Sequence, residues 1–324
     1  MTIRLLTLLL ASLLAAAPAA AQYKAPRTSF GDPDLQGLWT NSSITTLERP
    51  GNISKLVVSA EEARVIEAAT HNRLNADSRP TDPSVGAPKA GDDVRGYNAF
   101  WLDLGAKLAV VKGEIRTAWV VDPADGRVPY TAEGLRALRA AAARSFDGPE
   151  ERSVGERCIV GYGSTGGPPM LNVLYNNNYQ IVQAPGYVTI VVEMNHDARV
   201  IRLNGKHPPE HIRLWMGDSI GRWEGDTLVV ETTNLHPAQS FTADVRHRLY
   251  LAPNAKVTER FTRVAADEIL YAFTVEDRAA YTQTWRGEIP MRAAKGPMYE
   301  YACHEGNHSL GNILRGARYQ EKRR

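Results

Sequence analysis

The feature that most constrains this chain is a succession of short strand-forming runs that begins after Met170. Each run is rich in β-branched and aromatic residues and is bounded by Gly, Pro, Asn or Asp, which favour turns. The runs lie at 187–194, 227–232, 256–263, 269–276 and 281–290. Many short consecutive strands are typical of antiparallel barrels and sandwiches, so the sequence predicts a mainly β fold of that class.

Two helices are predicted on the amino-terminal side of these strands. Ser59 and Glu62 form a capping-box pattern, which predicts a helix that runs to about Asn75. A second helix is expected after Thr131, in an Ala- and Arg-rich stretch. Together with a Gly-x-Trp pattern that ends at Trp39, these features indicate an antiparallel calycin/lipocalin-like barrel or sandwich with a few covering helices. We expect one β-rich domain over residues 22–324, with a helical N-terminal cover.

Residues 1–21 have the three-part organisation of a secretory signal peptide. Arg4 supplies a positive charge, residues 5–14 form an apolar stretch, and the alanines at 19–21 form a small-residue cleavage site. A membrane span needs roughly 20 apolar residues, so this shorter stretch favours cleavage over an anchor. No later run is long and apolar enough to span a bilayer. We therefore expect a periplasmic or secreted mature chain.

The charge balance bears on the class of partner. The chain has 38 basic and 36 acidic residues, with no long block of one sign. Binding to nucleic acid or to an anionic membrane usually requires a basic patch, so neither partner is indicated. We expect a small-molecule ligand or substrate as the partner, and the sequence does not indicate an oligomeric state.

The chain has two cysteines, Cys158 and Cys303. In an oxidising compartment, two cysteines far apart in the sequence are most simply explained by one disulfide. The alternative is a reactive or metal-bound thiol, which His304 and Glu305 beside Cys303 would favour. No CxxC spacing supports that alternative.

The main catalytic hypothesis concerns the segment around His196. There, His196 and Asp197, with Glu193 nearby, have the residue types of a general acid/base group. An unbroken strand from Tyr187 would place alternating residues on one face, namely Glu193, Asn195, Asp197 and Arg199. A turn near His196 would change that register. The alternative is a structural ion pair between a carboxylate and Arg199 or Arg202.

Other polar residues form a second group of candidates. Asp218 and Arg222 lie beside predicted turns, and His304 and Glu305 belong to a polar segment that a Cys158–Cys303 disulfide would bring beside the loop at 157–169. Trp101, Trp119 and Tyr175 are aromatic residues that could line a pocket. The substrate-binding candidates are Asn176, Asn178, Arg199, His207 and Tyr301.

Several motifs together resemble those of a large family of exported proteins of environmental bacteria, most of them hypothetical proteins. The most specific are GRWEGDTLVVET at 221–232 and YEYACHEGN at 299–307, and the resemblance covers nearly the whole mature chain. The resemblance implies export and a single domain, and it implies no catalytic roles.

Three functions are consistent with the sequence. The first is a secreted enzyme without a cofactor that uses acid/base chemistry to hydrolyse, eliminate from or isomerise a small organic molecule in a β-barrel pocket. The second is a non-catalytic periplasmic binding protein for an apolar or aromatic ligand. The third is a metalloenzyme that uses His196, His207 and His304.

Overall fold

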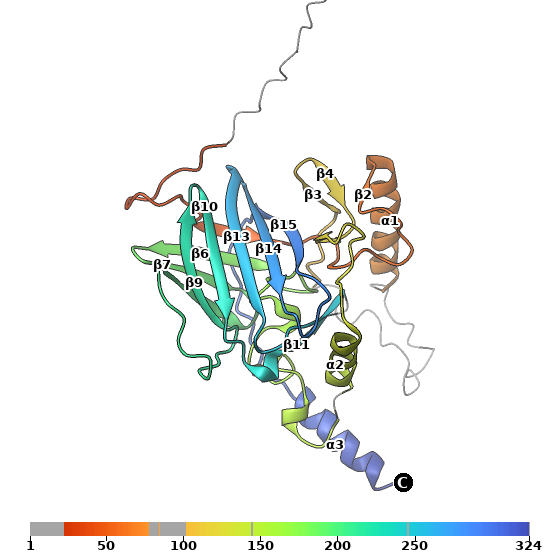
Figure 1. Cartoon of the computed structure of the whole chain (residues 1–324). Helices are drawn as coiled ribbons and strands as arrows, with labels where there is room; N and C mark the ends of the chain where they lie inside the picture. The colour runs from red at the N-terminus through yellow and green to blue at the C-terminus, as the bar shows by residue number, and fades with distance from the viewer. Residues whose placement is uncertain (1–22, 78–83, 85–101, 144, 245, 324) are drawn as a thin grey trace, which may run out of the picture.

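The structure is a computed structural model that describes residues 23–77, 84, 102–143, 145–244 and 246–323. The expected signal peptide and Trp101 therefore lie outside the described residues. The main body is a β-barrel (Figure 1). Its strands are β1 (Gly37–Thr40), β6 (Asn178–Ala184), β7 (Tyr187–Val192), β8 (Ala198–Leu203), β9 (Asp218–Glu224), β10 (Thr227–Thr233), β13 (Lys256–Ala265), β14 (Glu268–Glu276) and β15 (Trp285–Ala293).

The barrel is closed because β1 pairs with a strand on each side. Trp39 lies opposite Tyr179 of β6 and opposite Ala293 of β15. This closure gives a nine-stranded barrel and confirms the mainly β prediction at the level of a barrel.

One neighbouring pair departs from the expected antiparallel order, because β8 and β9 are parallel. Parallel neighbours cannot be joined by a tight hairpin. The chain instead returns through residues 204–217 before β9 begins at Asp218.

The barrel interior is filled by residues that alternate along the strands. In β14, every second side chain from Ile269 to Val275 is buried, as strand geometry requires. Four aromatic residues from three neighbouring strands are among the largest buried side chains of this core, namely Phe261, Tyr271, Phe273 and Trp285. The Gly-x-Trp tryptophan is also buried, and its indole N–H donates to the Leu35 carbonyl at 2.9 Å.

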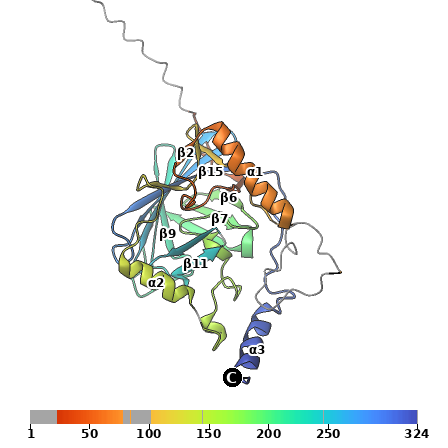
Figure 2. The same ribbon diagram turned by 90° about the vertical axis from the view of Figure 1, so that its right-hand side faces the viewer.

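Smaller sheets and helices cover the barrel. The smaller sheets contain β2 (Val57–Val58), β3 (Ala109–Val111), β4 (Glu114–Arg116), β11 (Phe241–Asp244) and β12 (His247–Tyr250). A further strand, β5 (Val120–Asp122), pairs with β15 at the edge of the main sheet. The helices are α1 (Ala60–Asp77), α2 (Ala132–Ala142) and α3 (Ser309–Glu321). Both views show α3 projecting away from the barrel (Figures 1 and 2).

The two predicted helix starts are confirmed. The Ser59 hydroxyl accepts from the Glu62 amide at 3.2 Å, and the Glu62 carboxylate accepts from the Ser59 amide at 2.8 Å. At α2, the Thr131 hydroxyl accepts from the Gly134 amide at 2.9 Å. These side chains satisfy amides that a helix start leaves without an intrahelical partner. Sequence analysis did not predict α3.

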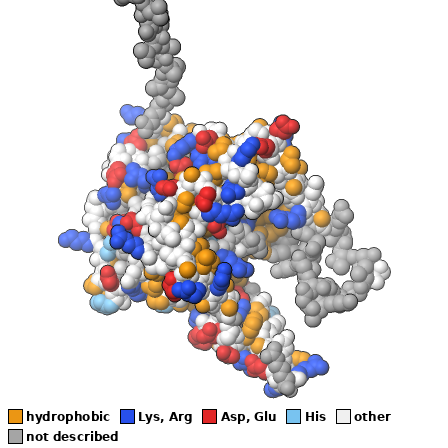
Figure 3. All heavy atoms as spheres, turned by 45° about the vertical axis from the view of Figure 1, so that its right-hand side comes forward, with side chains coloured by type: hydrophobic (Ala, Val, Ile, Leu, Met, Phe, Trp, Pro, Cys, Tyr) orange, Lys and Arg blue, Asp and Glu red, His pale blue; other side chains and the backbone are white. Residues whose placement is uncertain are grey.

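Among the described residues, no helix is both long enough and apolar enough to span a membrane. On the face shown in Figure 3, basic and acidic side chains are interspersed rather than gathered in one patch.

Candidate functional site

A large cavity lies where the start of β6 and the end of β7 meet the C-terminal part of the chain. We call it the Glu193 cavity, and its volume is about 1200 Å³. Segments from far apart in the sequence contribute to its wall. The lining residues with polar or aromatic side chains are Asp103, Tyr162, Tyr175, Asn176, Asn178, Glu193, Asp244, Tyr299, Glu300, Tyr301 and Glu305.

Glu193 lies in this wall because β7 ends at Val192 and a short turn follows. The Glu193 side chain is held at both oxygens. The side-chain amide of Asn178 donates to one oxygen at 2.7 Å, and the backbone amide of Tyr299 donates to the other at 2.8 Å. Only 3% of Glu193 is exposed. The carboxylate is therefore buried and fixed, and both of these donors are uncharged.

The C-terminal side of the cavity is formed by residues 299–308, which we call the C-terminal arm. A disulfide joins Cys303 of this arm to Cys158, as the sequence predicted. In addition, the side-chain amide of Asn307 donates to the sulfur of Cys158 at 3.3 Å. The disulfide therefore holds the arm beside the loop that contains Tyr162, and the two segments line one cavity.

Tyrosine side chains supply much of the aromatic surface of the cavity. Tyr162, Tyr175 and Tyr301 are partly buried and pack against the main hydrophobic core. Burial raises the pKa of Tyr301 above its usual value. The Tyr301 phenol is therefore protonated at neutral pH, where it can donate a hydrogen bond.

The structure brings together several residues that the sequence analysis proposed. The Glu193 cavity is lined by Glu193 and Glu305 from the catalytic candidates and by Asn176, Asn178 and Tyr301 from the substrate-binding candidates. Tyr175 also lines it, whereas Trp119 is fully buried in the core. The contributions of Asp103, Tyr162 and Asp244 were missed, because no local motif shows that these distant segments meet.

The structure gives His196 and Asp197 different surroundings. Asn195 and His196 both have positive φ angles, so the chain turns here and the strand does not continue unbroken. His196 is exposed to solvent. Asp197 is buried and accepts from the Gly161 amide at 2.7 Å. The two side chains therefore do not share one face, and neither lines the Glu193 cavity.

A change of Asp197 to Asn tests whether this carboxylate is structural. Burial raises the pKa of Asp197 above its ordinary 3.8, although the Gly161 and Asn195 hydrogen bonds act against that rise. A raised folded-state pKa contributes stability below the unfolded value, and that stability is lost as the pH rises through the folded value. The ionised form at neutral pH therefore costs stability.

We expect Asp197→Asn to keep or slightly raise the free energy of unfolding at neutral pH, because the amide oxygen still accepts from Gly161. Asp197→Ala should lower it by about 1 to 3 kcal/mol, because the Gly161 amide is left unpaired. Urea unfolding of both variants measures this difference. Equal losses in the two variants would show that the carboxylate charge itself is needed.

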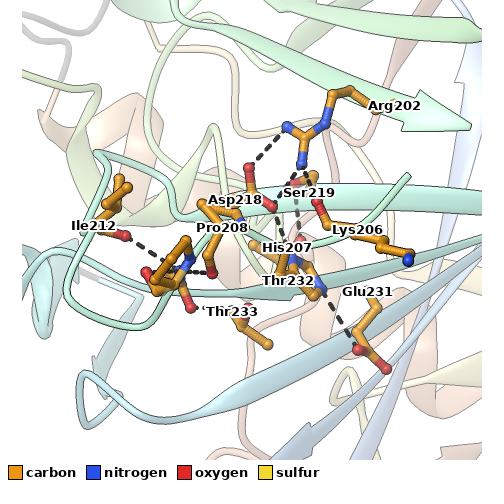
Figure 4. A network of polar contacts seen from close by, with 12 residues as sticks. Arg202, Lys206, His207, Pro208, Ile212, Asp218, Ser219, Glu231, Thr232 and Thr233 are labelled. Carbon is orange, nitrogen blue, oxygen red and sulfur yellow. Dashed lines mark hydrogen bonds and ion pairs between the residues drawn. The ribbon is translucent and has the colours of Figure 1, made fainter.

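Asp218 and His207 belong to a different network (Figure 4). Asp218 accepts from both terminal nitrogens of Arg202, at 2.8 and 2.9 Å, and its second oxygen lies 2.7 Å from Nδ1 of His207. The other ring nitrogen of His207 lies 3.5 Å from a Glu231 oxygen. Burial alone would raise the pKa of Asp218, but the bonds from Arg202 and His207 outweigh burial and lower it. The network attaches the 204–217 connection to the barrel.

The remaining candidates lie elsewhere. Arg199 is buried in the barrel interior, where it is paired with Glu259. Arg222 lies on the surface in an ion pair with Glu224, and His304 is an exposed residue of the C-terminal arm. The described residues contain no group of three or more His, Cys, Asp or Glu side chains arranged to hold a metal ion.

Comparisons with known proteins do not assign the chain to a family. A scan against protein-family models, a search of curated proteins and a search of solved structures found no significant match to the chain.

Proposed function

We propose that this protein binds a small organic molecule in the Glu193 cavity, with Glu193 as the fixed hydrogen-bond acceptor. The observation that carries the proposal is a carboxylate with 3% exposure in the wall of a cavity of about 1200 Å³. Drug-sized ligands occupy pockets of roughly 300–1,000 Å³ with an aromatic lining and a few fixed polar groups. The Glu193 cavity has that composition.

The environment of Glu193 favours a functional role over a purely structural one. Removing a carboxylate from water is costly unless a charge or a full set of hydrogen bonds compensates for it. Asn178 and Tyr299 each give Glu193 one neutral donor, although a carboxylate can accept about four hydrogen bonds. A ligand with an N–H or O–H group would supply a further donor.

A second candidate function is catalysis at the same cavity. Glu193 would act as a general base, and Tyr301, which burial keeps protonated by raising its pKa, would donate a hydrogen bond to the substrate. This pair supports the proposal of a hydrolase, lyase or isomerase that needs no cofactor. Because His196 is exposed, Glu193 replaces the His196–Asp197 pair as the proposed proton-transfer group.

The disulfide also supports the proposal that the chain is exported to the periplasm or secreted. Disulfides persist in oxidising compartments and are rare in the cytosol. We also propose that the barrel is of the calycin type and that the chain belongs to the family of exported proteins that its motifs resemble.

A cavity-filling substitution tests the location of the binding site. Ala302 lines the cavity and is exposed, so Ala302→Trp should fill space without disturbing the core. We expect its affinity for Nile red, a neutral aromatic dye that fluoresces in apolar surroundings, to fall at least about tenfold. An overpacked site costs about 1 to 3 kcal/mol, which corresponds to such a change.

Ala266→Trp is the matched control, because Ala266 is also exposed but does not line the cavity. Its Nile red affinity should equal that of the unchanged chain. The cavity would be excluded as the dye site if both tryptophan variants bound the dye equally well. A chain that binds no dye would also count against the proposal.

A further inference from the structure

The charged residues of the Glu193 cavity are of one sign. Its described lining contains no Lys, Arg or His, and its carboxylates are Asp103, Glu193, Asp244, Glu300 and Glu305. They come from four separate parts of the chain and converge only in the fold. A ligand in this cavity therefore meets negative charge from several sides.

A buried cation partly compensates two of these carboxylates. Arg246 interacts electrostatically with Asp103 and Asp244, and its guanidinium donates to the carbonyl oxygens of Ser43 and Leu104. Arg246 lines a neighbouring cavity and not this one. Its charge offsets part of the negative charge of Asp103 and Asp244, but its side chain does not enter the Glu193 cavity.

Within the described residues, the other three carboxylates have no such compensation. In the described part of the chain, Glu193, Glu300 and Glu305 form no ion pair with a basic side chain. Glu193 is buried at one wall, while Glu300 and Glu305 are exposed on the C-terminal arm. A buried carboxylate attracts a cation more strongly than an exposed one, because solvent screens it less. Glu193 is therefore the dominant charge.

The tyrosines add a second attraction for the same kind of ligand. An aromatic face is electron-rich and attracts a cation placed over it. Tyr162, Tyr175 and Tyr301 line the same cavity as Glu193. Aromatic walls also accept an apolar body, which an inorganic ion lacks. A bare metal ion needs converging ligands, and the described residues form no such group.

We infer that the ligand of the Glu193 cavity is an organic cation, an amine or quaternary ammonium group attached to an apolar or aromatic body. Glu193 faces the positive group, and the tyrosines contact the body and the charged head. This inference rests on the proposed binding function and specifies its ligand class. Anionic molecules of the same size are disfavoured by the carboxylates.

Three probes of similar shape and different charge test the inference. They are benzyltrimethylammonium, benzyl alcohol and benzoate, each titrated against the complete mature chain by calorimetry. We expect benzyltrimethylammonium to bind at least about tenfold more tightly than benzyl alcohol, with benzoate the weakest. Added salt should weaken the binding of the cation and leave that of the alcohol unchanged. Equal affinities, or a preference for benzoate, would overturn the inference.

Glu193→Gln separates the ligand class from the existence of the site. Gln has nearly the same size and removes the charge, so benzyltrimethylammonium affinity should fall about tenfold, and by more than the affinity for neutral benzyl alcohol. Exposed Glu300→Gln should reduce cation affinity by less. Unchanged affinity of Glu193→Gln for benzyltrimethylammonium would overturn the inference. The proposed binding site would still be supported in that case if Ala302→Trp weakened the binding of Nile red. If Glu193→Gln proves unfolded, two measurements on the unchanged chain still test the inference. They are the ranking of its affinities for the three probes and the effect of salt on its affinity for the cation.

Discussion

Glu259→Gln should be among the most destabilising single changes in this chain, with an expected loss of about 3 to 5 kcal/mol in the free energy of unfolding. Glu259 is fully buried and makes a two-pronged ion pair with Arg199, one contact being 2.9 Å long. Removing one member of a buried pair leaves the other charge uncompensated in a low-dielectric interior. The positive charge left uncompensated in this variant would be that of the Arg199 guanidinium.

The surroundings of the pair give no replacement for the lost carboxylate. Arg199 also donates to the hydroxyls of Ser219 and Thr232, which are neutral. The Tyr271 hydroxyl donates to Glu259 at 2.8 Å, and burial together with Glu259 raises the pKa of Tyr271 far above its usual value. Tyr271 therefore stays neutral and cannot balance the charge of Arg199.

Urea unfolding at neutral pH measures the loss. Arg222→Gln is the matched control, because its ion pair with Glu224 is exposed to solvent and should contribute little to stability. Replacing both buried partners, as Arg199→Met with Glu259→Leu, should recover much of the stability that Glu259→Gln loses. A loss in Glu259→Gln no larger than that of Arg222→Gln would show that the pair is not buried as described.

The second large effect is expected when both cysteines are replaced by Ser. The disulfide joins positions 145 residues apart. Closing a loop of that length restricts the unfolded chain, and the chain-entropy model gives about 4 to 5 kcal/mol of stabilisation. The free energy of unfolding should therefore fall by up to that amount.

The same double variant should also bind less benzyltrimethylammonium and less Nile red. The disulfide holds the C-terminal arm against the loop near Tyr162, so its loss allows one wall of the cavity to move away. Reduction of the unchanged chain with dithiothreitol should give the same two losses. Full retention of both affinities would show that the arm does not depend on the disulfide for its position.

The parts of the fold that the sequence predicted are those governed by local patterns. Strand alternation, the Ser59–Glu62 capping box and the pairing of two lone cysteines each follow from residues close in sequence or from a forced choice. The parallel pairing of β8 with β9 was not predicted, because it depends on the path of the 204–217 connection. The C-terminal helix α3 was not predicted either, because no side-chain cap marks its start after His308.

The candidate site was predicted only in part, for the same reason. Glu193, Asn178 and Tyr301 were chosen as polar residues at strand ends or in a dense motif, and they line one cavity. The turn at Asn195 and His196 was not predicted, because two successive residues with positive φ are not indicated by their residue types. Asp103 and Asp244 reach the cavity through tertiary packing, and short-range patterns cannot show that.

The most direct test of the account follows the backbone amide of Tyr299 by NMR while benzyltrimethylammonium is added to the protein. This amide donates to Glu193 at 2.8 Å, so its resonance reports on any ligand that engages that carboxylate. We predict a saturable shift of the Tyr299 amide and of the Asn178 side-chain amide, with the amide of Gly225 in the β9–β10 turn unchanged. The central claim is that the ligand engages Glu193. Saturable shifts at other resonances with none at Tyr299 or Asn178 would contradict it, and so would the absence of any saturable shift.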